Sequence, residues 1–181
     1  MNEKEIANEY LMQHQEVKAM RKEIRENEDG QYGTDAQKND LIRDLNRKWA
    51  SRVDDYRRMA ADARQERLQE AKKQAFNLSG TDARNALQMA ESFDKEELQK
   101  QYDKASERSD SKLQHAIAYV SFKQGRGDIL EKWAAESPAT ERQVQALSEA
   151  EQAANDITEL QNFYTSYGPI SSGGDESWVD Q

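Results

Sequence analysis

The sequence predicts an all-α protein: a long helical hairpin, followed by a helical bundle and an extended C-terminal tail. Ala, Glu, Lys, Leu and Arg, whose abundance is typical of long helices and coiled coils, make up 79 of the 181 residues. Only eight glycines and two prolines punctuate the chain, and they gather at a few positions. Between those positions, apolar residues recur about every 3.5 residues, as they do along one face of a helix. The intervals are therefore predicted to be helices, and the glycines and prolines are predicted to mark the joints between them.

The first helix is predicted from Glu3 to Glu28. Its apolar seam repeats at alternating spacings of four and three residues, which is a heptad pattern with one polar position. The seam consists of Ile6, Tyr10, Gln13, Val17, Met20 and Ile24. A loop at residues 29–33 ends this helix. Thr34, with Gln37 three residues later, matches the capping-box pattern that begins a new helix.

The second helix, predicted from Asp35 to Leu78, is the longest element. At about 1.5 Å per residue it is about 66 Å long, so it extends past the first helix in an antiparallel hairpin. Its apolar line has the same heptad-like spacing and is formed by Ile42, Leu45, Trp49, Val53, Tyr56, Ala60 and Ala63. Residues 1–78 are therefore expected to form a hairpin arm.

Further helices are expected over residues 79–167, as a bundle region. One is predicted from Asp82 to about Gln124, with a bend or restart at residues 106–111, where Ser and Asp side chains compete for backbone hydrogen bonds. A short helix follows from Asp128 to Glu136. Ser137 before Pro138 marks the start of a last helix that ends before Gly168. Residues 168–181 are expected to be an extended Gly/Ser-rich acidic tail.

Charge is distributed unevenly over these segments. The net charge of −9 comes mainly from residues 125–181, which carry 3 basic and 11 acidic side chains, whereas residues 35–78 carry 11 basic and 8 acidic ones. The basic helix could bind phosphates or an acidic protein surface. The candidate partner-binding residues are Arg43, Arg47, Arg57, Arg58, Arg64 and Arg67.

A second interpretation of the basic helix is a solvated surface with internal ion pairs, such as Asp44–Lys48 and Asp54–Arg58 at i, i+4. The eight interspersed acids favour it over nucleic-acid binding. In a third interpretation, the basic helix meets the acidic third of a neighbouring copy, head to tail. The tail also has two interpretations: a solvated terminus, or a docking peptide with Trp178 as its anchor.

The residues of catalytic and metal sites are scarce. The chain has no cysteine and only two histidines, His14 and His115, neither with metal-ligand spacing. His14 is expected beside the first seam, and His115 at a boundary between helices. No nucleophile elbow or phosphate-binding loop is present. The sequence therefore predicts no catalytic residues, no metal site and no cofactor.

The expected location follows from two further absences. No run of 18 apolar residues suggests a membrane span, and the charged start, Met1 to Glu5, lacks the apolar stretch of a secretory signal. Cytoplasmic production in a reducing compartment is expected.

The expected function is structural. Leu, Ile, Val and Phe make up only 27 of the 181 residues, so association with other chains would supply buried surface that one chain lacks. The charged helix at 35–78, the helical block at 82–167 and the tail at 170–181 resemble the small helical accessory proteins of tailed bacteriophage particles. This resemblance implies a virion head or head–tail component, with partners that are further copies or other virion subunits. The alternatives are regulatory binding to a host factor through the acidic C-terminal third, and nucleic-acid binding through the basic helix.

Overall fold

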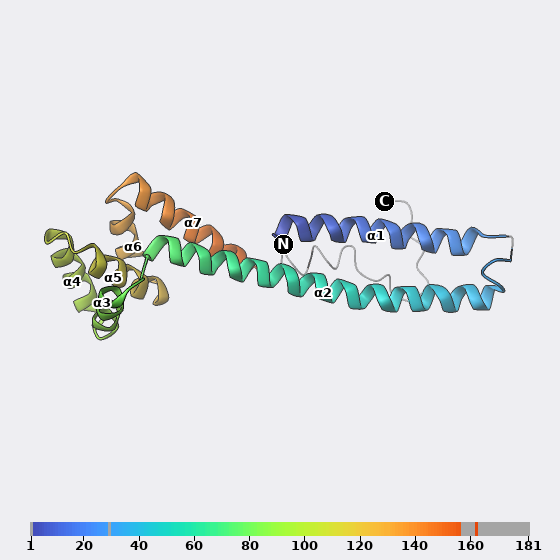
Figure 1. Ribbon diagram of the computed structural model, residues 1–181, viewed down its shortest axis with the longest axis horizontal. Helices are drawn as coiled ribbons and strands as arrows, with labels where there is room; N and C mark the ends of the chain where they lie inside the picture. Colours follow the sequence, from blue (N-terminus) through green and yellow to red (C-terminus); the bar gives the residue numbers. More distant parts are fainter. Residues whose placement is uncertain (1, 29, 157–161, 163–181) are drawn as a thin grey trace. The chain divides into compact units, whose positions relative to one another are not determined.

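The computed structural model describes residues 2–28, 30–156 and 162, and within them it is all-α, with seven helices and no strands (Figure 1). Contacts divide the described residues into two compact units. The first, which we call the arm, comprises residues 2–64 with 156 and 162, and the second, the bundle, comprises residues 65–155. This boundary lies inside the second helix, whereas the predicted boundary after residue 78 lies in the loop that follows it. The predicted tail, residues 168–181, lies outside the described residues.

In the arm, α1 (Glu3–Glu26) and the first part of α2 (Asp35–Phe76) run antiparallel and side by side (Figure 1). Both helices end about two residues earlier than predicted. The arm core is largely aromatic: the ring of Tyr10 stacks on Trp49 at 5.4 Å and meets the edge of Tyr56 at 5.5 Å. Ile6, Val53 and Ala60 complete this core. The large aromatic rings therefore supply much of the buried apolar surface in a chain that is poor in aliphatic residues.

The hairpin loop is fixed at the start of α2 by the predicted capping box. The Thr34 amide donates to Oε1 of Gln37 at 2.8 Å, and the Gln37 amide donates back to Oγ1 of Thr34 at 3.4 Å. Gly33 precedes them with φ +78°, and a Cβ at this position would collide with the Gln37 side chain. The positive φ therefore favours glycine at this turn, and a larger residue would also displace the Gln37 side chain from the capping box.

The predicted seam of α1 is wrong at one position. Met20 is 49% exposed, and Arg21 lies partly buried in its place, between Val17 and Ile24. The alternating heptad spacing assumes a supercoil, whereas a straight helix advances about 100° per residue and places position 21, not 20, nearest the line through Val17. The aliphatic stem of Arg21 fills this position.

The bundle gathers the end of α2 with five shorter helices. These are α3 (Thr81–Glu91), α4 (Lys95–Glu107), α5 (Ser111–Lys123), α6 (Gly127–Ala134) and α7 (Pro138–Asn155). Phe76, at the end of α2, stacks on Trp133 of α6 at 5.3 Å and meets the edge of Tyr119 of α5 at the same distance. His115 meets the edge of Trp133 at 5.4 Å, so it lies at the predicted boundary between helices.

One partly buried polar cluster joins three parts of the bundle. The Tyr102 hydroxyl and Nε2 of Gln114 both donate to Oε1 of Glu136, each at 2.6 Å. Burial, and then the hydrogen bond to Glu136, raise the pKa of Tyr102. The phenol therefore stays protonated as the donor of this cluster.

The helix predicted over residues 82–124 is three helices. The break at residues 106–111 is confirmed, because α4 ends at Glu107 and Asp110 caps α5 by accepting from the Leu113 amide at 3.1 Å. A further break at residues 92–94 was not predicted. There Asp94 caps α4 by accepting from the amides of Glu96 and Glu97, at 3.0 and 2.8 Å. The start of α7 at Pro138 is confirmed, with Ser137 accepting from the Thr140 amide.

Candidate interaction surface

The two flanks of α2 in the arm differ in exposure. Trp49, Val53, Tyr56 and Ala60 are buried in the arm core and define the centre of the helix face toward α1. Leu41 and Met59 are 18 residues apart, about five helical turns, so they share one flank of this face. Asn46 and Arg64 are also 18 residues apart and share the opposite flank, with Arg57 between them. We call the first the open flank and the second the covered flank.

Exposure separates these flanks clearly. Leu41 and Met59 on the open flank are 44% and 40% exposed, although both side chains are apolar. On the covered flank, the charged side chains of Arg57 and Arg64 are only 31% and 10% exposed. The apolar side chains of the open flank are therefore more exposed than the charged side chains of the covered flank, which is the reverse of the usual preference of apolar groups for the interior.

Arg64 is the most enclosed of the six candidate arginines. Its Nε donates to Oε1 of Glu3 at 2.7 Å, and its Nη1 donates to the backbone carbonyl of Asp156 at 2.9 Å. The guanidinium thus joins the start of α1, α2 and the chain after α7, using several of its five donors in one planar group. Arg64 is a structural residue of the arm rather than an exposed phosphate ligand.

Several polar atoms inside the arm are shielded from solvent and have no hydrogen-bond partner among the described residues. They are Nε and Nη2 of Arg21, Oδ1 of Asn46, Nε1 of Trp49 and Nε of Arg57. Such groups are rare in native proteins, because each unsatisfied buried polar atom costs about 1–3 kcal/mol. The arm interior therefore offers donors and an acceptor that α1 and α2 do not use.

His14 lies beside the seam of α1, as predicted, and packs against Tyr10 and Trp49 at 6.2 and 5.7 Å between ring centroids. Burial lowers the pKa of this imidazole, and the positive charges of Arg21 and Lys18 lower it further. His14 is therefore a neutral packing residue at pH 7.

The other candidate arginines are mostly engaged by neighbouring acids. Arg43, Arg47, Arg57 and Arg58 each pair with an aspartate three residues earlier, at distances from 2.7 to 3.4 Å. The predicted i, i+4 pairs Asp44–Lys48 and Asp54–Arg58 are thus replaced by i, i+3 pairs, although Nε of Arg58 donates to the Asp54 backbone carbonyl. Surface pairs of this kind contribute little to stability.

The six arginines differ in how available they are for binding. Arg57 and Arg64 lie on the covered flank, and Arg43, Arg47 and Arg58 are exposed elsewhere on the helix. Arg67 is exposed and belongs to the bundle. Trp178, the remaining candidate, lies outside the described residues. Aspartates beside four of these arginines and the enclosure of Arg64 make α2 a poor surface for phosphate binding.

The described part of the chain offers little for catalysis. It contains no group of three His, Asp or Glu side chains that could hold a metal ion. A shallow depression at the hairpin loop includes Asp40 and Asp44, and both carboxylates are paired, with Arg43 and Arg47 respectively. None of the described helices has the length and apolar character needed to cross a membrane.

Sequence reasoning missed the two flanks. It placed Tyr10, Trp49 and Tyr56 correctly on apolar lines, but it treated the basic residues of α2 as one group and did not single out Leu41 or Met59. The signal was present: both lie 80° to one side of Trp49 when residues are placed about 100° apart around the helix. Comparisons with family models, with curated proteins and with solved structures found no match to this chain.

Proposed function

We propose that the protein is a non-enzymatic subunit of a larger assembly, and that copies of the chain associate through the open flank of the arm. The observation that carries the proposal is the exposure of Leu41 and Met59 on one line of α2. Burial of two large apolar side chains in a neighbouring copy would remove surface that a monomer leaves in water.

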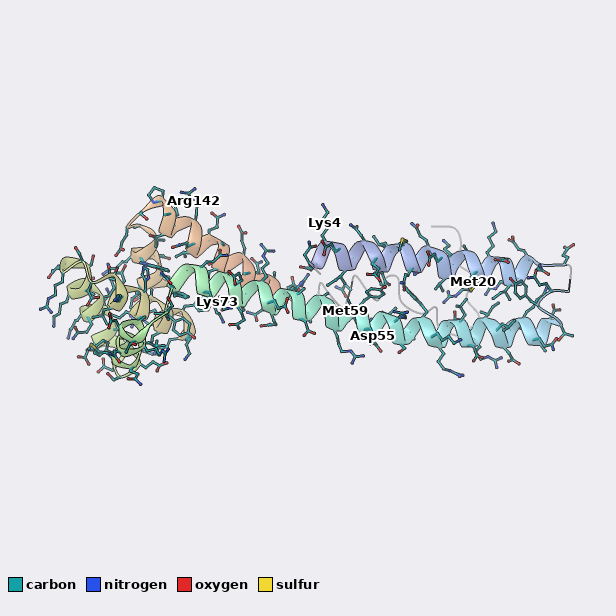
Figure 2. The ribbon with its side chains drawn as sticks, viewed as in Figure 1. Lys4, Met20, Asp55, Met59, Lys73 and Arg142 are labelled. Carbon is teal, nitrogen blue, oxygen red and sulfur yellow. The ribbon has the colours of Figure 1, made fainter. Side chains whose placement is uncertain are left out.

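A third apolar side chain supports the same surface. Met20 of α1, like Met59 of α2, is exposed within the arm; Figure 2 labels both residues. Methionine is flexible and polarizable, so it adapts to a partner surface at little cost. Arg52 is exposed and lies between Leu41 and Met59 on the same flank, so such a contact would also enclose its guanidinium, which would need an acidic or carbonyl partner on the neighbouring copy.

The setting we propose is a bacteriophage particle, at the head or the head–tail junction. This part rests on the resemblance of the long charged helix, the helical block and the tail to accessory proteins of such particles. A purified protein of this kind should bind its own copies or another particle subunit. Cytoplasmic production followed by incorporation into a virion fits this role.

Nucleic-acid binding through α2 is the weaker alternative. Four of the six candidate arginines are held by aspartates on the same helix, and Arg64 is enclosed within the arm. Binding by phosphate contacts would weaken steeply as salt rises from low to physiological concentration. Regulatory binding through the acidic C-terminal third is the other alternative, and charge reversal of Asp175, Glu176 and Asp180 would abolish it.

The proposal is tested by removing the apolar side chains of the open flank. We expect Leu41→Ser with Met59→Ser to raise the dissociation constant for self-association about tenfold or more in analytical ultracentrifugation. Met89→Ser is the matched control, because Met89 is 52% exposed but belongs to the bundle. An unchanged dissociation constant in the double variant would contradict the proposed surface.

A further inference from the structure

Two basic side chains of α2 in the arm are exposed and unpaired in the part of the chain that the structure describes. They are Lys48 and Arg52, which form no side-chain hydrogen bond or ion pair there. Every other basic side chain of α2 in the arm meets an acid or a backbone carbonyl. Both residues lie on the open flank, within about 20° of the line through Leu41 and Met59 around the helix. The open flank therefore presents two positive charges that a partner could bind.

One acidic side chain of α1 is available on the same side of the arm. Glu16 is exposed, and its carboxylate has no hydrogen bond or ion pair among the described residues. Glu3, which meets Arg64 on the covered flank, lies about 40° to one side of Val17 around α1. Glu16 lies about 100° to the other side of Val17, as does the exposed Met20 at about 60°. Glu16 and Met20 therefore belong to the α1 side of the open flank.

The acid and the two bases lie at the same level along the arm. The Tyr56 hydroxyl donates to Oε1 of Glu9 at 3.2 Å, which puts these two residues at one level of the antiparallel pair. Glu16 is seven residues further along α1, so it is level with position 49 of α2, seven residues before Tyr56. Lys48 and Arg52 lie on either side of that position. The open flank thus carries a negative charge on one helix and two positive charges beside it on the other.

Two identical arms that face each other through this flank are related by a two-fold axis, and the charges favour one direction of that axis. An axis along the helices lays α1 of one copy over α2 of the other at the same level, so Glu16 faces Lys48 and Arg52 at two equivalent contacts. An axis across the helices lays α1 over α1, where Glu16 meets no base. The basic residues of α1 all lie on the other side of Val17: Lys4, Lys18, Arg21, Lys22 and Arg25.

We propose that two copies pair through their open flanks with both hairpin loops at the same end, so that Glu16 of each copy binds Lys48 and Arg52 of the other. This pairing rests on the self-association proposed above and specifies its geometry. Each of the four arm helices then runs antiparallel to both of its neighbours, as in an up-and-down four-helix bundle. Arg52 also gains the acidic partner that its enclosure in the contact requires.

Charge reversal in the full chain tests the pairing. Lys48→Glu with Arg52→Glu makes the open flank wholly acidic at this level, and Glu16→Lys makes it wholly basic. We expect each variant to raise the dissociation constant for self-association about tenfold or more in analytical ultracentrifugation, because like charges then meet at both contacts. An equimolar mixture of the two variants should associate within about threefold of the wild type, because opposite charges then meet at both contacts.

A matched control makes the same change of charge elsewhere on α2. Arg47→Glu with Arg58→Glu alters two exposed arginines that point away from α1, so it should leave the dissociation constant within about twofold of the wild type. Circular dichroism checks that every variant is folded. If either open-flank variant associates as tightly as the wild type, or if the mixture associates no better than its components, the pairing is overturned, although association through the apolar side chains would stand. A wild-type chain that never associates would instead refute the proposed function itself.

A distance measurement checks the direction of the axis independently of charge. The chain has no cysteine, so Gln31→Cys in the hairpin loop accepts a single nitroxide label. Pulsed electron resonance on the associated, labelled chain should give a separation below about 30 Å, because two loops at the same end are about two helix diameters apart. A separation above about 40 Å, close to the length of the arm, would place the loops at opposite ends and overturn the pairing.

Discussion

Arg64 of α2 and Glu3 of α1 join the two arm helices at the end opposite the hairpin loop. Their atoms lie 2.7 Å apart from Nε to Oε1, and 61 residues separate them in sequence. The loop closes one end of the hairpin, and this ion pair closes the other. The same guanidinium also holds the backbone at Asp156, so one side chain organises three segments of the arm.

Arg64→Met should destabilise the arm by about 2 kcal/mol, because it removes charge-assisted hydrogen bonds at a largely buried group while keeping the aliphatic stem. Urea unfolding followed by circular dichroism measures the change. Arg47→Met is the control: its side chain is 78% exposed and pairs with Asp44, so the loss should stay below about 0.5 kcal/mol. Equal effects of the two substitutions would show that Arg64 has no special role.

Trp133→Ala should destabilise the bundle by about 3–5 kcal/mol, the usual cost of truncating a buried aromatic side chain. Trp133 is almost fully buried and stacks on Phe76, so its loss leaves a cavity at the end of α2. Thermal unfolding of the variant, compared with Met89→Ala on the exposed surface of α3, measures the cost. A Trp133→Ala variant as stable as the wild type would rule out this core.

Stability of the arm should fall as pH drops below about 6.5. The pKa of His14 is lowered from 6.5 by burial and by Arg21 and Lys18, so below 6.5 the unfolded chain takes up a proton that the folded arm resists. Well above that pH the imidazole is neutral in both states and contributes no dependence. The free energy of unfolding, measured between pH 5 and pH 8, should show this decline in the wild type.

His14→Gln should flatten the part of the pH profile that His14 causes, whereas His115→Gln should leave it in place. If both histidine variants keep the wild-type profile, another group is responsible.

Asp94→Ala should cost about 1 kcal/mol, because Asp94 accepts from two amides at the start of α4. Asp94→Asn, which can also cap a helix, should recover most of the loss. Chemical denaturation measures both. An Asp94→Ala variant that is as stable as the wild type would mean that the break at residues 92–94 does not depend on this cap.

The sequence predicted the helices well where glycine, proline or a capping box marks their ends. Thr34 with Gln37 and Ser137 with Pro138 are local signals, and the structure has helices beginning where they predict. The break before α4 has neither glycine nor proline. The sequence feature that marks this break is Asp94 with Glu97 three residues later, a capping pattern. Such a pattern is a weaker indication of a helix end than a glycine.

The arm surface could not be predicted in the same way. Which side of α2 is covered depends on Arg64 meeting Glu3 and Asp156, contacts between residues far apart in sequence. Local spacing gives the angle of a residue around a helix but not what lies next to it. For the same reason, the arginines of α2 looked alike in sequence, although Arg64 is enclosed and Arg58 is exposed.

The most direct test of the proposed assembly role is the solution mass of the full chain, measured by light scattering over a wide range of concentration. One chain has a mass of 20.8 kDa. If copies associate through the open flank, the measured mass should rise with concentration to a multiple of this value. A mass that stays at 20.8 kDa at every concentration would contradict association of copies through the open flank.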